Sequence, residues 1–188
     1  MDIIKNNYKK INECRVSSSK NLTKVLDLGL HPLANSLKKN QFDSENKYPL
    51  TLSFCEESSL LQLNETIKKE ILFDSYLWVT STSSTAKKYS EIFFSNINNT
   101  IKLDKENDLI IEIASNDGTF LKPFVRNGFR KVYGIDPAQN ISEIANKNNI
   151  NTINEYWSKD LANNLLKKHG TASLIFARNV IPHVSELN

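Results

Sequence analysis

Residues 109–118, Leu109-Ile110-Ile111-Glu112-Ile113-Ala114-Ser115-Asn116-Asp117-Gly118, decide the fold of the second half of the chain. The near-continuous apolar run at their start is typical of a strand buried on both faces of a parallel sheet. Residues 119–127 place apolar side chains on one helical face, and Gly128 is a helix-ending residue. Residues 131–135 form a second apolar run. The order strand, helix, strand predicts a βαβ unit whose ligand crevice lies at the 114–118 turn.

Strand and helix signals continue to alternate toward the C-terminus. Pro137 is expected to open the next helix, because a missing N–H costs nothing at the first helical position. Residues 152–153 and 172–177 are predicted as the third and fourth strands, and Ser158 should cap the helix between them. The alternation predicts the α/β fold class, with a partial Rossmann-like parallel sheet preceded by a small α+β domain.

The first half of the chain has short apolar runs broken by polar clusters. Alternation predicts strands at 25–29, 50–54 and 60–63, with a proline-containing loop at 31–35. A helix is expected at 87–98, because apolar residues recur there at helical spacing. Its apolar stripe contains Tyr89, Ile92, Phe93 and Ile97, and the expected front core contains Leu26, Leu28, Leu50, Leu52 and Phe54. The expected domains are 1–70, a connecting helical segment at 71–104, and 105–188.

Composition limits the possible partners. The 24 basic and 21 acidic residues give a formal net charge of +3, and they are mixed along the chain, as in Lys68-Lys69-Glu70. Mixed charges are typical of a solvated surface, so no nucleic-acid partner is expected. No apolar stretch approaches the roughly 18 residues of a membrane span, and the N-terminus does not resemble a signal peptide. We therefore expect no membrane partner and a cytoplasmic protein with reduced cysteines.

The turn after the first strand predicts a nucleoside ligand that carries positive charge. It has one glycine and two acids, Glu112 and Asp117, and it lacks the G-x-G-x-x-G pattern of dinucleotide sites. Asp136 ends the second strand, where a carboxylate can accept two hydrogen bonds from a ribose diol. S-adenosylmethionine has a sulfonium and an ammonium group, which acidic neighbours would stabilise. The alternative is that Glu112 and Asp117 only cap a helix and orient a loop.

A set of short motifs runs through the chain in a fixed order. The second half has EIASNDGTFLK at 112–122, GIDPA at 134–138, NINT at 149–152 and ARNVIPHV at 177–184. Together they resemble the sugar C-methyltransferase family, class I S-adenosylmethionine-dependent enzymes that act on deoxysugar nucleotides. The first half adds LGLHPLAN at 28–35, YPL at 48–50 and FDSY at 73–76, so the resemblance covers nearly the whole chain.

The resemblance implies S-adenosylmethionine as cofactor and a small-molecule acceptor, a nucleotide sugar. By this resemblance Asp136 binds the ribose, Glu112 and the 114–118 turn hold the methionine portion, and Asn179 lies at the methyl-transfer end. The cofactor-binding residues it implies are Glu112, Ala114, Ser115, Asn116, Asp117, Gly118, Asp136, Pro137 and Asn179.

Methylation of carbon requires a base that removes a proton next to a carbonyl. Tyr76 and His183 are the candidate acid–base residues, and an imidazole pKa of about 6.5 suits proton transfer at neutral pH. His183 could equally be a structural residue that lines the pocket. In the family, a Glu-His pair beyond the position of Asn188 is the stronger candidate for the base. Trp78 stands where the family tends to have a tyrosine, which keeps a stacking surface but loses the phenol.

The family's front domain is described as zinc-binding, with cysteine pairs at C-x-x-C spacing. This chain keeps the spacing but has serine as the second member of each pair, in Cys14 with Ser17 and in Cys55 with Ser58. Because structural zinc sites use thiolate or imidazole ligands, we expect no zinc. His31 could supply a third ligand, although a single loop histidine is more often structural.

Family members continue well beyond the length of this chain. In class I methyltransferases the strands lie in the order 3-2-1-4-5-7-6, so this chain would end with its fourth strand as an unpaired edge. We expect such a chain to self-associate and to bind cofactor without methyl transfer. Two other functions stay open: a degenerate S-adenosylmethionine-binding module without turnover, and a small-molecule O- or N-methyltransferase that shares only the cofactor half.

Overall fold

The computed structural model describes residues 7–185 and 187, and the chain divides into two compact units. The first, which we call the front unit, contains residues 7–72, 183–185 and 187. The second, which we call the sheet unit, contains residues 73–182. Within the described residues, no helix is long and apolar enough to cross a membrane.

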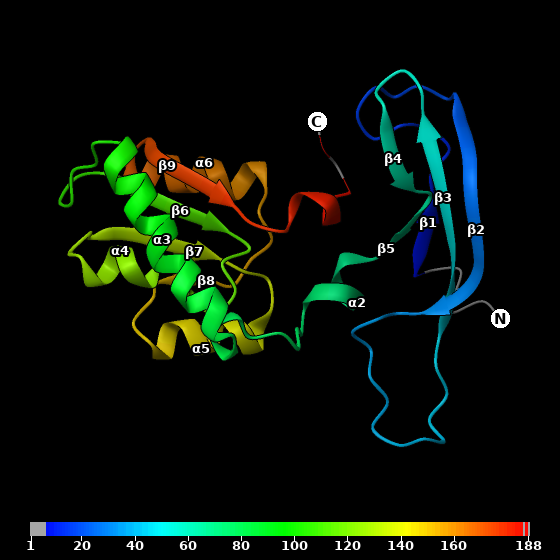
Figure 1. Cartoon of the computed structure of the whole chain (residues 1–188), viewed down its shortest axis with the longest axis horizontal. Coiled ribbons are helices and arrows are strands. Elements are labelled where there is room, and N and C mark those ends of the chain that lie inside the picture. The colour runs from blue at the N-terminus through cyan, green and yellow to red at the C-terminus, as the bar shows by residue number, and fades with distance from the viewer. Residues whose placement is uncertain (1–6, 186, 188) are drawn as a thin grey trace. The chain divides into compact units, whose positions relative to one another are not determined.

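A four-stranded parallel sheet forms the centre of the sheet unit (Figure 1). Its strands lie in the order β8-β7-β6-β9, so β6, the first of them in sequence, is flanked by the second and the fourth. This order and direction confirm the predicted partial Rossmann-like sheet. The strands are β6 (Leu109–Ile113), β7 (Lys131–Ile135), β8 (Thr152–Ile153) and β9 (Ala172–Ala177).

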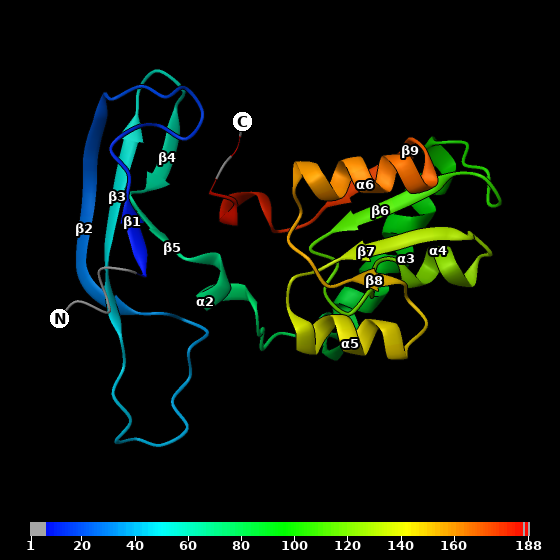
Figure 2. The ribbon, with the colours of Figure 1, turned by 180° about the vertical axis from the view of Figure 1, so that it is seen from behind.

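Helices cover both faces of this sheet, and β6 supplies core residues to each face. Ile110 lies in one apolar cluster with Phe124 of α4. Leu109 and Ile111 lie in a second cluster with Leu165 of α6. Alternate residues of a strand point to opposite faces, so β6 is buried on both sides, as its apolar run predicted. Figure 1 and Figure 2 show α3 and α6 on opposite sides of the sheet. The helices are α3 (Ser84–Thr100), α4 (Lys122–Arg126), α5 (Gln139–Lys147) and α6 (Lys159–His169).

Aromatic side chains of α3 pack this helix onto the core. Phe93 packs against Phe120 with ring centroids 5.7 Å apart, and Phe94 packs edge-to-face on Phe124 at 4.9 Å. The predicted stripe is wrong at Ile92, which is 54% exposed. The buried face of α3 is shifted toward Phe94, because the large ring of Phe124 offers it an edge-to-face partner.

The start of α6 follows the prediction and the start of α4 does not. The side chain of Ser158 accepts the N–H of Leu161 at 3.2 Å, so it caps α6 as expected. The helix α4 begins at Lys122 rather than Thr119, because the residues between Gly118 and Lys122 form hydrogen-bonded turns.

Pro137 does not open α5. The helix begins at Gln139, after the extended N-cap residue Ala138. The N–H of Ala138 donates to Oδ1 of Asp136 at 3.0 Å, and this bond holds the chain in a turn before the helix can start.

Two antiparallel sheets make up the front unit. The strands β2, β3 and β4 form one sheet with β3 in the middle, and β1 pairs with β5. His31 pairs with Tyr48 within this sheet, so the predicted loop begins only after Pro32. The strands are β1 (Tyr8–Lys10), β2 (Leu22–Pro32), β3 (Lys47–Cys55), β4 (Leu60–Leu63) and β5 (Glu65–Ile67), and the short helices of the chain are α2 (Lys69–Phe73), η1 (Thr80–Thr82) and η2 (Ile181–His183).

The predicted apolar core of the front unit is wrong. From Thr51 to Cys55 along β3 the buried side chains are Thr51, Ser53 and Cys55, whereas the apolar residues between them are only half-buried. Tyr48, near the start of the strand, is also buried. Leu26 and Leu28 on β2 are 46% and 50% exposed. Because alternate residues of a strand face opposite sides, the interior is the face that carries the small polar side chains. The half-buried residues are Leu50, Leu52 and Phe54.

Candidate functional site

The turn that follows β6 lies at the carboxyl edge of the parallel sheet. Ala114 and Asn116 have left-handed backbone conformations, with φ of 55° and 51°. The N–H of Ser115 donates to the carbonyl of Ile135 at 3.1 Å, which joins the turn to the end of β7. Ligands of open α/β sheets bind at this edge, so the fold brings the predicted residues of the turn and the strand ends together at a suitable place.

The carboxylate of Asp136 binds the loops on either side of it. Its Oδ2 accepts the N–H of Asn116 at 2.8 Å, and its Oδ1 accepts the N–H of Ala138 at 3.0 Å. Burial raises the pKa of Asp136, and these two hydrogen bonds oppose the shift. Each carboxylate oxygen keeps a second lone pair. The side chain can therefore accept a pair of hydroxyl groups without losing its internal bonds.

Glu112 is a buried carboxyl group with spare hydrogen-bonding capacity. It is 2% exposed, and its Oε2 has no hydrogen-bond partner among the described residues. Burial raises the pKa of Glu112 well above its ordinary value; the charge of Arg178 lowers it, and Asp136 and Asp117 raise it further. Within the same described residues, Oγ of Ser115 is also buried without a partner. Buried polar atoms are nearly always satisfied, so these two atoms indicate a place for a ligand or an ordered water.

Replacing Glu112 with glutamine is expected to stabilise the protein without ligand at neutral pH. The folded-state pKa of Glu112 lies above its unfolded value of 4.5, so the folded state binds this proton more tightly than the unfolded state. That stabilisation is present below the unfolded pKa and is lost as pH rises through the folded pKa. The variant avoids this loss, so it should be roughly 1–3 kcal/mol more stable than wild type near neutral pH.

Urea unfolding of both proteins across a pH series measures this difference. The two curves should converge at acidic pH and separate as pH rises. The matched control is Glu143→Gln, which changes an exposed carboxylate on α5 and should leave the pH dependence as in wild type. Parallel curves for wild type and Glu112→Gln would show that Glu112 titrates alike in the folded and unfolded states.

Residues 74–82, which we call the strap, run along the same edge. The carbonyl of Asp74 accepts the N–H of Gln139 at 3.2 Å. The side-chain amide of Asn140 accepts the N–H of Tyr76 at 3.1 Å and donates to its carbonyl at 2.8 Å. Because one amide binds both backbone groups of Tyr76, this residue is fixed to the first turn of α5.

The turn after β6 holds the second part of the strap. Nδ2 of Asn116 donates to the carbonyl of Trp78 at 2.9 Å, and Oδ1 of Asn116 accepts the N–H of Thr80 at 2.8 Å. Oδ2 of Asp117 accepts the N–H of Ser81 at 3.0 Å. The side chains of Asn116 and Asp117, which the resemblance assigns to the methionine portion, thus hold the strap at the sheet edge.

Gly118 lies where the fold leaves no room for a side chain. Its φ is +75°, and a Cβ atom there would lie 2.6 Å from Cγ2 of Ile150. In the fold, the side chain of Ile150 occupies that space, so the requirement for glycine comes from packing.

A hollow of about 290 Å³ lies where β7 and β8 end. The hydroxyl of Tyr156 donates to Oδ1 of Asp74 at 2.7 Å. Nδ2 of Asn154 donates to the carbonyls of Asp136 and Pro137 at 3.0 and 2.7 Å. Of the residues that line the hollow only Pro137 was predicted from the sequence, although the rule that ligands bind at strand ends, applied to the third strand, also leads to Asn154. The lining residues are Asp74, Pro137, Gln139, Asn154, Glu155 and Tyr156.

The sequence is similar to a known methyltransferase over nearly its whole length. It is 29% identical over 180 residues to the C-methyltransferase NovU of Streptomyces niveus, a match that covers 95% of this chain and 42% of that protein. The chain thus spans less than half the length of this curated relative. Residues 14–73 match the family model described as "Putative zinc binding domain". The chain is therefore similar to the N-terminal region of a C-methyltransferase. The resemblance drawn from its motifs is confirmed at this level.

A solved structure similar to this chain is the plantazolicin methyltransferase BpumL in complex with a pentazolic desmethylPZN analogue and SAH. The similarity covers 41% of this chain and 32% of that chain, with 23% identity and a TM-score of 0.34. A TM-score this low does not establish shared detail. The fold described above rests on the strand order and strand direction of the chain itself.

The motif ARNVIPHV at 177–184 follows β9 at the carboxyl edge. The guanidinium of Arg178 lies over the ring of Phe120. Burial lowers the pKa of Arg178, and the nearby Glu112 opposes that shift. Arg178 was not predicted as a site residue, although its position directly after a parallel strand points to the ligand-binding edge. Asn179 is exposed and has a left-handed backbone with φ of 53°.

The two candidate acid–base residues lie in different units. Tyr76 is part of the strap in the sheet unit, with its ring centroid 6.5 Å from that of Phe73. His183 ends the short helix η2 and belongs to the front unit. Their roles in proton transfer therefore stay predictions.

The four cysteine and serine positions of the front unit come together. Sγ of Cys14 lies 3.1 Å from Oγ of Ser58, and Oγ of Ser17 lies 3.6 Å from Sγ of Cys55. No group of three or more histidine, cysteine, aspartate or glutamate side chains in residues 7–185 and 187 could hold a metal ion. His31, considered as a third ligand, instead has Nε2 2.9 Å from the carbonyl of Leu28.

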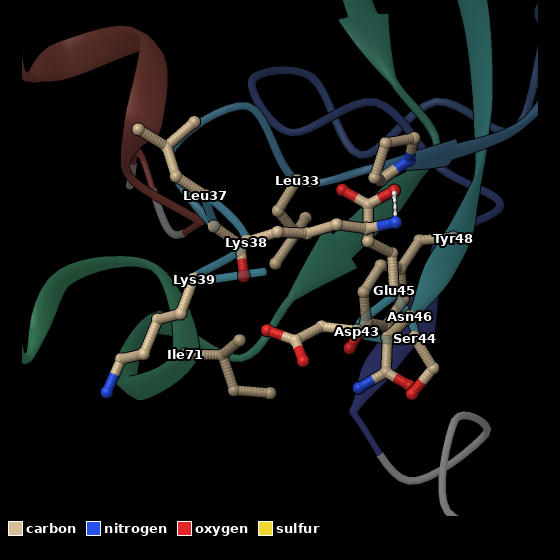
Figure 3. A pocket seen from close by; sticks show the side chains of 12 residues that line it. Leu33, Leu37, Lys38, Lys39, Asp43, Ser44, Glu45, Asn46, Tyr48 and Ile71 are labelled. Atoms are coloured by element: carbon tan, nitrogen blue, oxygen red, sulfur yellow. Dashed lines mark ion pairs between the residues drawn. The ribbon is translucent and has the colours of Figure 1, made fainter. Parts of the chain in front are cut away.

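The front unit also contains a hollow of about 230 Å³ beside the connection between β2 and β3 (Figure 3). Two lysines, Lys38 and Lys39, and two acids, Asp43 and Glu45, contribute to its lining. Nζ of Lys38 lies 3.5 Å from Oε2 of Glu45, an ion pair drawn in Figure 3. Positive and negative side chains are balanced here, so the hollow has no excess charge that would select an ionic cofactor.

Proposed function

We propose that this chain is the cofactor-binding part of an S-adenosylmethionine-dependent methyltransferase. The supporting observation is the pair of buried acids at the carboxyl edge, Asp136 with spare lone pairs and Glu112 with an unpartnered oxygen among the described residues. A ligand that offers a diol to Asp136 and positive charge to Glu112 suits both acids. S-adenosylmethionine has this combination, whereas a dinucleotide would bring a pyrophosphate near two acids.

The proposal assigns each part of the cofactor to residues of the sheet unit. Asp136 accepts hydrogen bonds from the ribose hydroxyls. The hollow where β7 and β8 end takes the adenine, with the carboxylate of Glu155 as an acceptor for its amino group. Glu112 lies near the cationic methionine portion, which relieves the cost of a buried carboxylate without a partner. Asn179 is the candidate residue at the methyl-transfer end.

We further propose that the acceptor is a nucleotide-linked keto-deoxysugar that is methylated on carbon. The similar Streptomyces niveus protein is named a C-methyltransferase, which supports transfer to carbon. When bound, the cofactor supplies an electrophilic methyl group. The protein must remove a proton from the carbon next to the acceptor carbonyl and hold that carbon in line with the methyl group. Tyr76 and His183 are the candidates for moving this proton.

Titration calorimetry with S-adenosylhomocysteine tests the cofactor assignment, with NAD⁺ as the comparison ligand. We expect saturable binding of about one S-adenosylhomocysteine per chain and no binding of NAD⁺, because the turn has two acids where a pyrophosphate would lie. A folded chain that binds neither ligand, or that prefers NAD⁺, would contradict the proposal.

Methyl-labelled S-adenosylmethionine with a dTDP-4-keto-6-deoxysugar tests the acceptor assignment. Label on a carbon atom of the sugar, located by NMR, would support the C-methyltransferase assignment. Label on oxygen or nitrogen would support the O- or N-methyltransferase alternative. Cofactor binding without labelled product would support the binding module without turnover.

Asn116 should couple the cofactor to the strap. One residue donates its N–H to the ribose-binding carboxylate of Asp136 and holds Trp78 and Thr80 through its side chain. Asn116→Asp removes the donor to the Trp78 carbonyl, so we expect about fivefold weaker binding of S-adenosylhomocysteine, the effect of one lost hydrogen bond. Aspartate tolerates the left-handed backbone at this position.

Tryptophan fluorescence can report on the strap independently of affinity. The chain has two tryptophans, and only Trp78 lies in the strap. In a Trp157→Phe background the remaining indole is Trp78, and its emission should change on cofactor binding in the parent and change less in Asn116→Asp. The matched control is Asn127→Asp, which removes an amide that donates to the Pro123 carbonyl within α4. An Asn116→Asp protein with parental affinity and parental emission change would show that the strap and the cofactor site are independent.

A further inference from the structure

Two turns of the front unit have the same backbone form. Each begins with a cysteine and has a serine three positions later, Cys14 with Ser17 and Cys55 with Ser58. The next residues, Ser18 and Ser59, both have left-handed backbones, with φ of 59° and 57°. Non-glycine residues seldom adopt this conformation. Two turns that share it at corresponding positions are therefore a matched pair.

The side chains of the two turns are paired crosswise. The thiol of Cys14 meets the hydroxyl of Ser58 at 3.1 Å, and the hydroxyl of Ser17 meets the thiol of Cys55 at 3.6 Å. The backbone N–H groups of Val16 and Ser17 both lie 3.5 Å from Sγ of Cys14. Cys14 and Cys55 are 1% and 0% exposed. Each thiol therefore has a polar partner in an environment without solvent.

These four side chains do not fit structural zinc. Such a site uses four thiolate or imidazole ligands, and this cluster offers two thiols and two neutral hydroxyls. In the part of the chain that the structure describes, no third histidine, cysteine or carboxylate joins the two thiols. A zinc ion here would keep a coordination shell half made of weak ligands.

Hydrogen bonds that need no metal already join the first turn to the sheet. The N–H of Arg15 donates to Oε1 of Gln62 at 3.0 Å, and Nε2 of Gln62 donates to the carbonyl of Glu13 at 3.0 Å. Gln62 lies on β4 and is 5% exposed. Its two bonds join β4 to the backbone on either side of Cys14.

We propose that Cys14, Ser17, Cys55 and Ser58 form a zinc-independent core, in which two thiol–hydroxyl pairs join the turns that a metal ion joins in a four-cysteine site. Because the two turns have matched backbones, replacing their two serines with cysteines should create a metal site. Ser17→Cys with Ser58→Cys would give four thiols on the same two turns, the ligand set of structural zinc.

Metal analysis of wild type and Ser17→Cys/Ser58→Cys, both purified with zinc present, tests the proposal. Wild type should hold no stoichiometric zinc, and EDTA should leave its unfolding midpoint unchanged. The double variant should hold about one zinc per chain, show the absorption of tetrahedral thiolate-bound Co²⁺ after exchange, and lose thermal stability in EDTA. Wild type with one tightly held zinc, or a folded double variant that takes up neither metal, would overturn the proposal.

Ser58→Ala keeps the proposal testable if the double variant does not fold. It removes the hydroxyl that pairs with Cys14, so the unfolding midpoint should fall by the same amount with and without EDTA. Ser59→Ala, which leaves the pair intact at an exposed position, is the comparison for effects of the turn itself. A midpoint that falls for Ser58→Ala only in the presence of zinc would show that a metal, and not the hydroxyl pair, joins the turns.

Discussion

Asp136→Asn is expected to weaken S-adenosylhomocysteine binding by about 1–3 kcal/mol, or roughly 5- to 150-fold. The carboxylate accepts two backbone N–H groups and has lone pairs left for a ribose diol. Asparagine has one acceptor oxygen, and its NH₂ group would point a donor at the N–H of Asn116 or Ala138. The variant therefore loses both a ligand contact and part of the preorganised loop. Calorimetry measures the affinity, and thermal unfolding measures the change in stability.

The control for this substitution is Asp108→Asn. Asp108 precedes β6, at the amino end of the strand, and its Oδ1 accepts the hydroxyl of Ser173 at 2.6 Å. The same chemical change is thus made at the opposite edge of the sheet, where no cofactor contact is proposed. Equal affinities for wild type and Asp136→Asn would show that the ribose is not bound by this acid.

Gly118→Ala is expected to destabilise the sheet unit by about 2–5 kcal/mol. A left-handed backbone costs a residue with a side chain roughly 1–2 kcal/mol. The added Cβ would also lie 2.6 Å from Cγ2 of Ile150, which is 2% exposed and packed in the core. The side chain of Ile150 cannot move away without displacing its neighbours. Denaturant unfolding followed by circular dichroism measures the loss.

Gly128→Ala separates the two parts of that cost. Gly128 has φ of +91° in the same unit, and nothing lies within 4 Å of the position of its Cβ. Its replacement should therefore cost only the backbone part, about 1–2 kcal/mol. A double-mutant cycle of Gly118→Ala with Ile150→Ala should give an interaction energy of about 1 kcal/mol or more, because the second change removes the obstructing atoms. Equal costs for the two glycine substitutions would mean that Ile150 is not the obstacle.

The parallel sheet could be predicted because its strands are buried on both faces. The run at 109–113 is apolar on both faces except at Glu112, near the carboxyl end, so its sequence pattern and the topology agree. The carboxyl-edge rule then located Glu112, Asp136 and the turn between them. The same rule, applied to the ends of β8 and β9, would have found Asn154 and Arg178.

The front unit and the strap could not be predicted in this way. On β3 the buried face carries Thr51, Ser53 and Cys55, so hydrophobic alternation pointed to the wrong side of the strand. The strap is held by bonds between side chains and backbone groups, such as that from Asn116 to Trp78. Such bonds join positions far apart in the chain and leave no periodic trace in the sequence.

The attachment of the strap bears on how proteins of this kind can exchange modules during evolution. Residues 73–104 precede the first parallel strand, so a recombination point at the start of β6 looks natural from the sequence. Such a crossover would separate Phe93 from its partner ring in the core, and would separate Trp78 and Thr80 from the asparagine that binds them. A front module inherited from another lineage would be compatible with this sheet only if the junction fell before the strap, near residue 73.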